Sequence, residues 1–180
     1  VKKRYGFIYV DRTDDDPIII AGGPCAFNPE PLADFIDIFI IGDGEVSLPK
    51  LVKKYVQYKS KATTKKEFYK EICNDEGIYI PEFYDVEYNN DGTIKKYVKV
   101  FSSAPDKIER CILEDIDMID FPKNNIVPFI ETVHDRAVVE IFRGCTRGCR
   151  FCQAGMIYRP VRERSKDTII NLAREQIKNT

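Results

Sequence analysis

The sequence predicts an α/β protein: a partial Rossmann-like parallel sheet with an α/β and hairpin insertion, followed by a separate strand–loop–helix unit. Three observations support this prediction. Two β-branched runs end on glycines, at Gly22 and Gly42. A turn sequence at 89–92 separates two extended runs, and three cysteines within 145–152 directly follow an apolar run.

The first sheet is predicted from the runs 17–21 and 37–41, which stop at Gly22-Gly23 and Gly42-Asp43-Gly44. Continuous β-branched runs are typical of strands buried on both faces. Residues 29–36 leave room for a short helix between them, which makes a right-handed βαβ unit with parallel strands. The glycines then lie at the carboxyl edge of the sheet, where open α/β sheets bind ligands. A shorter strand-like run covers 7–10.

The middle of the chain predicts two helices and a hairpin. The first helix has apolar residues at helical spacing, namely Leu48, Leu51, Val52, Tyr55 and Val56. A capping box at 64–67 opens the second helix. Residues 78–88 and 93–100 form the arms of a hairpin around 89–92, and 102–135 form an irregular, charged connector.

The last part of the chain reads as strand, loop and helix. Residues 137–142 predict the strand, the cysteines follow at once, and Ser165 caps a helix with apolar residues spaced for burial. Three regions are therefore expected: 1–58 as a partial Rossmann-like domain, 59–135 as the insertion and connector, and 136–180 as the strand–loop–helix unit.

Composition narrows the class of protein. The chain has 180 residues, 43% of them apolar and 32% charged, with a net charge of −1, so it predicts a soluble globular protein without an overall case for nucleic-acid binding. The arginines near the cysteines leave local nucleic-acid binding open. No apolar run approaches the roughly 20 residues that span a bilayer, and the start lacks a signal sequence. We expect a cytoplasmic protein that does not contact membranes.

The six cysteines predict a metal site in a reducing compartment rather than disulfides. Cys145, Cys149 and Cys152 are clustered. The remaining three, Cys25, Cys73 and Cys111, are scattered, which is typical of small buried apolar residues.

Two kinds of metal site are possible for the cysteine cluster, a structural zinc site and an iron–sulfur cluster. A structural zinc site needs four ligands, usually from two C-x₂-C pairs, and only Cys149 and Cys152 form such a pair. The sole histidine, His134, lies beyond the predicted strand and is poorly placed as a fourth ligand. Three cysteines can instead ligate three irons of a [4Fe–4S] cluster and leave the fourth iron open, so the spacing favours an iron–sulfur cluster.

The composition of the loop suits that cluster. Gly144 and Gly148 allow backbone amides to approach sulfides closely, and Phe151 offers a flat apolar surface. Amide hydrogen bonds and the positive charges of nearby arginines stabilise a reduced cluster. The arginines concerned are Arg143, Arg147 and Arg150.

The string Arg143-Gly-Cys-Thr-Arg-Gly-Cys-Arg-Phe-Cys-Gln-Ala-Gly155 resembles the signature of the radical S-adenosylmethionine (SAM) superfamily. Together with 22–31, 41–45 and 158–165 it is similar to the branch that has an N-terminal cobalamin-binding-like domain. The resemblance is weakest across 60–130. It implies that residues 136–180 begin a (β/α) barrel, and that later barrel strands complete the SAM site, so we expect the 180 residues alone to be inactive.

The resemblance also implies cofactors and a partner. Cys145, Cys149 and Cys152 would bind the cluster, whose open iron chelates SAM, and the backbone around Phe151 would contact the adenine. Reductive cleavage of SAM would give a 5′-deoxyadenosyl radical, with the electron supplied by a reducing partner such as flavodoxin or ferredoxin.

Cobalamin is the third cofactor that the branch suggests. Its site would lie at the sheet edge, lined by Gly22, Gly23, Gly42 and Gly44. The D-x-H-x-x-G motif of many cobalamin domains would precede residue 1, and Cys25 stands where related proteins often have histidine. The alternative is a Rossmann-like scaffold without cobalamin, in which the glycines only allow tight turns.

The role of residues 158–165 and the class of the whole protein each have alternative interpretations. Arg159, Arg162, Glu163 and Arg164 predict either a solvated linker or contacts to a phosphate-bearing substrate such as RNA, and charge runs favour the linker. The similar stretch of tRNA methylthiotransferases suggests such an enzyme, with a second cluster on the scattered cysteines. The last alternative is a non-enzymatic zinc-binding module.

Overall fold

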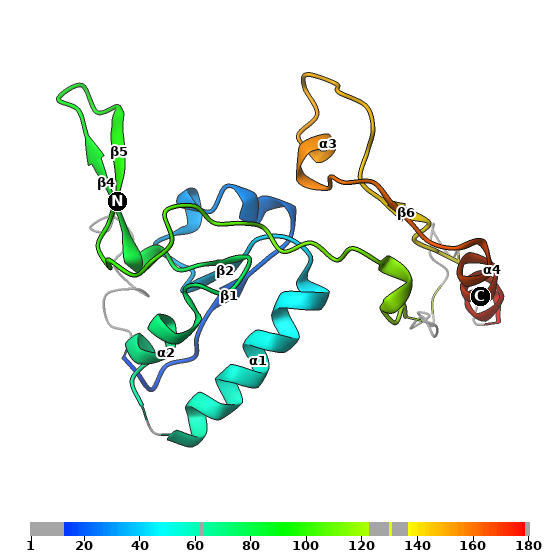
Figure 1. The fold of residues 1–180 in the computed structure, drawn as a ribbon, viewed down its shortest axis with the longest axis horizontal. Coiled ribbons are helices and arrows are strands. Elements are labelled where there is room, and N and C mark those ends of the chain that lie inside the picture. Colours follow the sequence, from blue (N-terminus) through cyan, green and yellow to red (C-terminus); the bar gives the residue numbers. More distant parts are fainter. Residues whose placement is uncertain (1–12, 62, 123–129, 131–136, 179–180) are drawn as a thin grey trace. The chain divides into compact units, whose positions relative to one another are not determined.

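The computed structural model describes residues 13–61, 63–122, 130 and 137–178. It divides into two compact units, Val1–Ile112 and Leu113–Thr180 (Figure 1). Helices and small sheets are mixed along the chain, which confirms the predicted α/β class. The finer Rossmann-like and barrel assignments, and the three domain boundaries, stay predictions. The strand-like run at 7–10, most of the second half of the connector, and His134 lie outside the described residues.

A three-stranded sheet lies at the centre of the first unit, with the strands in the order β1, β2, β3. The strands are β1 (Ile20–Ala21), β2 (Ile38–Ile40) and β3 (Ile78–Tyr79). β1 and β2 are parallel, as predicted from the two glycine-ended runs. β3 pairs antiparallel with β2, which the sequence did not predict, because 78–88 was assigned to the hairpin alone.

The two faces of this sheet bury alternate residues of the segment 38–41, which contains β2 and Ile41. Ile38 and Ile40 pack with two helices, whereas Phe39 and Ile41 pack with the β1–β2 connection on the other side. Each such side chain contributes about 1.5–3 kcal/mol by burial. Because residues 38–41 are buried on both faces of the sheet, all four of them are apolar.

The β1–β2 connection contains two 3₁₀ helices, at Pro24–Phe27 and Glu30–Leu32, where the sequence predicted a short helix over 29–36. Proline has no backbone N–H to donate, so Pro29 and Pro31 remove two donors from the segment, and i→i+3 bonds form its short helices. The amide of Leu32 donates to the carbonyl oxygen of Pro29 at 2.9 Å, and that of Ala33 donates to Glu30 at 3.2 Å.

Both predicted helices form, as α1 (Gly44–Lys61) and α2 (Lys65–Ile72) (Figure 1). The capping box is confirmed: the Thr64 side chain accepts from the Glu67 amide at 3.3 Å and the Thr64 amide donates to the Glu67 carboxylate at 3.0 Å. The apolar face predicted for α1 is partly wrong. Its core residues are Leu51 and Tyr58, whereas Leu48, Val52 and Val56 are exposed along a neighbouring stripe.

The hairpin is confirmed as β4 (Tyr84–Tyr88) paired with β5 (Ile94–Lys99). Its turn is closed by the amide of Gly92, which donates to the Asn89 carbonyl at 3.0 Å, with Gly92 at φ 84°. Part of the predicted irregular connector returns to the sheet. Cys111 forms a parallel bridge with Gly42.

The second unit contains a short antiparallel pair, β6 (Phe142–Arg143) and β7 (Arg162–Glu163), and the helices α3 (Ala154–Ile157) and α4 (Lys166–Ile177). Ser165 caps α4 as predicted, accepting from the Thr168 amide at 3.2 Å. The predicted strand 137–142 is wrong for its first five residues. A strand persists only where a neighbour satisfies its backbone, and among the described residues β7 is the neighbour found.

No helix among the described residues has the length and apolar character needed to cross a membrane.

Candidate functional site: the cysteine loop

The three clustered cysteines lie on one loop, 144–161, which leaves β6 and returns as β7. Phe142 pairs with Glu163 and Arg143 pairs with Arg162, so the two ends of the loop meet. The one-turn helix α3 lies within it. The β6–β7 pair therefore fixes the base from which the thiols project.

Gly144 allows that base to close. Its φ is +94°, and a Cβ there would lie 2.7 Å from the carbonyl oxygens of both Tyr158 and Pro160. Only glycine tolerates this combination of backbone conformation and contact. Gly144 therefore allows the two ends of the loop to come together. Gly148 differs, because nothing lies within 4 Å of a Cβ built on it.

The three thiols are accessible. Cys149 is exposed, and Cys145 and Cys152 are partly exposed, all three without disulfides. The amide of Arg147 donates to the Cys145 sulfur at 3.4 Å, and the Cys152 amide donates to the Cys149 carbonyl at 3.1 Å. Across the part of the chain that the structure describes, no three His, Cys, Asp or Glu side chains are arranged to hold a metal ion. The donor set fits an iron–sulfur cluster in its chemistry, with soft sulfur ligands and an amide directed at one sulfur.

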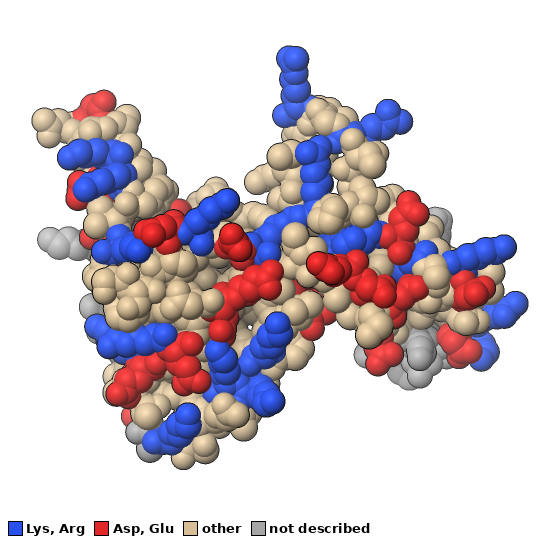
Figure 2. All heavy atoms as spheres, in the orientation of Figure 1, with Lys and Arg blue, Asp and Glu red and all other residues tan. Residues whose placement is uncertain are grey.

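The loop is positively charged. Residues 141–162 include five arginines and no aspartate or glutamate. Arg147, Arg150 and Arg159 are exposed, and Figure 2 shows basic side chains projecting from this part of the second unit. Phe151 is also on the surface, with 92% of its area exposed.

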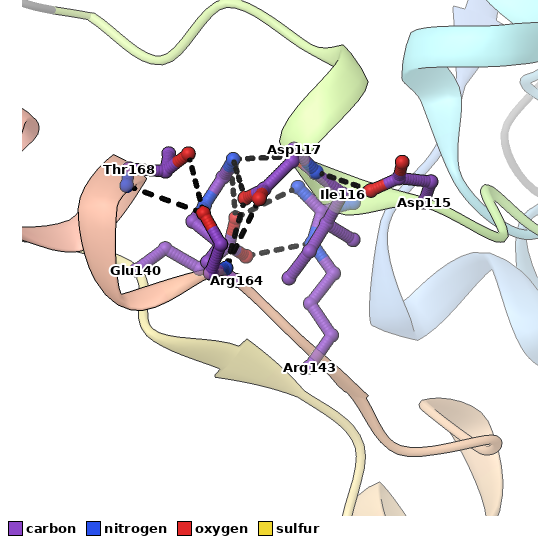
Figure 3. Close-up of polar contacts among 8 residues, drawn as sticks. Asp115, Ile116, Asp117, Glu140, Arg143, Arg164 and Thr168 are labelled. Carbon is purple, nitrogen blue, oxygen red and sulfur yellow. Dashed lines mark hydrogen bonds and ion pairs between the residues drawn. The ribbon is translucent and has the colours of Figure 1, made fainter.

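Arg143, predicted to balance the charge of a cluster, is held in an ion pair instead. Its Nε donates to Glu140 Oε1 at 2.6 Å and its Nη2 donates to Glu140 Oε2 at 3.2 Å. This two-point contact is the strong geometry for an arginine and a carboxylate. Glu140 also accepts from Arg164 Nη2 at 3.1 Å, so one carboxylate joins two arginines (Figure 3).

The predicted solvated linker at 158–165 is wrong for two of its arginines. Arg162 and Arg164 are buried, whereas Arg159 and Glu163 are exposed. Arg162 Nη1 donates to the Leu113 carbonyl at 2.6 Å. Arg164 Nη1 donates to the Ile116 carbonyl, and its guanidinium lies 5.6 Å from the centre of the Phe121 ring. A buried charge requires such partners, so these residues have structural roles.

Asp117 connects the same region to α4. Its carboxylate accepts from the Ser165 amide at 3.0 Å and lies 4.0 Å from Arg164 Nη1. The hydrogen bond from Ser165, and to a lesser extent the charge of Arg164, lowers the pKa of Asp117. Sequence reasoning missed Glu140 and Asp117. The sequence signal that could have indicated these two acids is the group of arginines at 143, 162 and 164, because buried arginines need acidic partners.

The glycines at the sheet edge differ in their surroundings. A Cβ on Gly42, which has φ +115°, would lie 2.1 Å from the Cys111 carbonyl oxygen. The amide of Cys111 donates to Ile41 at 2.9 Å, and that of Asp43 donates to Cys111 at 2.9 Å. Gly42 is thus explained by the close approach of the chain's own backbone. Gly22, Gly23 and Gly44 have no such close contact.

A cavity of about 640 Å³ lies near this edge, lined among others by Phe27, Ile41, Tyr79 and Ile108. Tyr79 is held there by a short hydrogen bond from its hydroxyl to Glu30. Burial, followed by that bond, raises the pKa of Tyr79, so its hydroxyl stays protonated near neutral pH. The lining also includes four charged residues, namely Glu76, Lys107, Glu109 and Arg110.

Of the scattered cysteines, Cys73 and Cys111 are buried, as predicted, and Cys25 is exposed, which corrects that prediction. Burial raises the pKa of both Cys73 and Cys111. A metal-ligating cysteine must lose its proton. Both thiols are therefore protonated near neutral pH.

Comparison with known proteins relates the N-terminal part of the chain to a family. The model of the family described as "Radical SAM proteins, N-terminal" matches residues 6–81. This match agrees with the resemblance to the radical SAM superfamily that the cysteine loop suggested.

Among individual proteins, the chain is 30% identical over 168 residues to an uncharacterized protein of Methanocaldococcus jannaschii. This alignment covers 93% of the chain and 30% of that relative, so the chain spans less than a third of the relative's length. No solved structure matches the chain significantly.

Proposed function

We propose that the protein is a radical SAM enzyme in which Cys145, Cys149 and Cys152 bind a [4Fe–4S] cluster. The observation that supports this most directly is the placement of all three thiols on one accessible loop, in a chain whose residues 6–81 match the radical SAM family model. When bound, such a cluster supplies an electron that cleaves SAM reductively to a 5′-deoxyadenosyl radical.

The residues of the loop have distinct tasks in this proposal. The three thiolates are the ligands, and the amide of Arg147 donates to one of their sulfurs. Phe151, on the accessible side of the loop, contacts the adenine of SAM through its backbone and shields the site with its ring. Further segments of the intact protein complete the SAM site.

The exposed arginines of the loop favour a negatively charged partner. Arg147, Arg150 and Arg159 have no acidic neighbour in sequence within 141–162. A surface of one charge steers an oppositely charged partner by long-range attraction. We therefore include an acidic electron donor, flavodoxin or ferredoxin, as the reducing partner.

The test is anaerobic reconstitution of the intact protein with ferrous iron and sulfide, followed by iron analysis and electron paramagnetic resonance. We expect about four irons per chain and a signal that changes when SAM is added. Replacing Cys145, Cys149 or Cys152 by alanine should abolish the signal. Cys25→Ala is the matched control, because Cys25 is also exposed, and it should leave the signal intact.

The two alternative functions make different predictions. A tRNA methylthiotransferase with a second cluster requires about eight irons. Cys73 and Cys111 are buried whereas Cys25 is exposed, which disfavours a second cluster on these three cysteines. A zinc-binding module would give a colourless protein with stoichiometric zinc, and a brown, oxygen-sensitive protein excludes it.

A further inference from the structure

We propose that Glu140 is a positioning residue for the cysteine loop, an inference that rests on the proposed function. Glu140 contacts Arg143, which lies just before the loop, and Arg164, which lies just after it (Figure 3). The carboxylate thereby holds both ends of the segment 144–161, from which the three thiols project.

The contacts are strong and well shielded. Only 15% of the Arg143 side chain, 25% of Glu140 and none of Arg164 is exposed. With Asp117 at 4.0 Å from Arg164, the group contains two positive and two negative side chains. Removing the charge of Glu140 takes away the carboxylate that contacts the fully buried Arg164 at 3.1 Å and the two-point partner of Arg143. Unpaired buried charge is costly, so the arginines must move.

Movement of the arginines would reach the loop through the backbone. Arg143 is a β6 residue whose strand partner is Arg162, and the Arg164 amide donates to the Ile141 carbonyl at 2.9 Å. Gly144 is already in tight contact with Tyr158 and Pro160, so the base of the loop has little freedom to absorb a shift. Residues that orient metal ligands in this way affect metal affinity by about 10–100-fold when they are replaced.

The experiment compares Glu140→Gln with the wild-type intact protein. Both are reconstituted anaerobically with ferrous iron and sulfide, and the visible absorbance of the cluster is followed after an iron chelator is added. We expect the variant to lose its cluster about 10-fold faster. Glu163→Gln is the matched control, since Glu163 lies on β7 and is exposed, and its rate should equal that of wild type.

Asp117→Asn separates positioning from general stability. Asp117 contacts Arg164 and Ser165, which both follow the loop. It should lower the thermal stability of the second unit and leave the rate of cluster loss near wild type. If Glu140→Gln does not fold, Arg143→Lys, which keeps the charge but not the two-point contact, should still release the cluster faster.

The outcomes distinguish the two proposals. If wild type binds a cluster through the three cysteines and both Glu140→Gln and Arg143→Lys release it at the wild-type rate, Glu140 does not position the loop. Equal acceleration by Asp117→Asn also overturns the positioning role. If wild type binds no iron under these conditions, the proposed function itself fails, and the role of Glu140 fails with it.

Discussion

At the scale of single residues, some glycines are required because a Cβ would overlap neighbouring backbone, whereas others have open space around them. Gly42 and Gly77 both have positive φ and both lie against the 109–111 segment. The Gly77 amide donates to the Glu109 carbonyl at 2.8 Å. These two positions admit a backbone segment that a side chain would exclude.

Gly42→Ala should therefore destabilise the first unit. The new Cβ would overlap the Cys111 carbonyl, and the left-handed backbone would be strained, with an expected loss of roughly 1–3 kcal/mol. Gly23→Ala is the control, because Gly23 also has positive φ, at 88°, but has no atom within 4 Å of its Cβ position. Denaturant unfolding of both variants measures the difference. Equal losses would show that backbone strain, and not the contact with Cys111, decides the effect.

At the scale of elements, two signals that rest on neighbouring residues were confirmed, and one strand that rests on a distant partner was mostly wrong. The capping box of α2 and the 89–92 turn depend on residues within three or four positions, and both formed as predicted. The strand at 137–142 depends on a distant neighbour and formed only at its end. The buried state of Arg162 and Arg164 depends on the carbonyls of Leu113 and Ile116, about fifty positions away in sequence, which no local pattern reveals.

The start of α4 should respond to acid through Asp117. The pKa of this carboxyl is lowered in the folded protein, chiefly by the hydrogen bond from Ser165. Its stabilising effect is thus fully present above the unfolded pKa of about 3.9 and is lost as the pH falls through the lower folded pKa. Thermal unfolding between pH 7 and pH 2 should show this loss in wild type. Asp117→Asn should be less stable at pH 7 and should have a weaker dependence over the acid range.

At the scale of the whole molecule, charge is distributed unevenly although the net charge is only −1. The cysteine loop carries arginines without acids, while acidic residues occur elsewhere on the same surface view (Figure 2). The three cysteines and their arginines could be predicted from the sequence because they are contiguous. The convergence of Glu140, Arg143 and Arg164 could not, because it requires the fold.

The charge of the loop leads to a kinetic prediction. Reduction by an acidic flavodoxin or ferredoxin should slow as ionic strength rises, because salt screens the attraction that steers encounter. Arg150→Gln should lower the second-order rate several-fold at low salt and flatten its salt dependence. Lys66→Gln, on exposed α2 surface, serves as the control and should change neither. A rate for Arg150→Gln that matches wild type at every salt concentration would contradict steering by this surface.

The meeting of both loop ends at the β6–β7 pair also has a consequence for protein engineering. A segment that starts and finishes at adjacent antiparallel positions can be exchanged without redirecting the chain on either side. Lengthening such a segment lowers the free energy of unfolding only slightly, since each doubling of a flexible loop adds about 0.6 kcal/mol of closure entropy. Residues 144–161 are in that sense a transplantable segment, whose acceptor must supply two paired backbones, the two flanking arginines and an acid that contacts both.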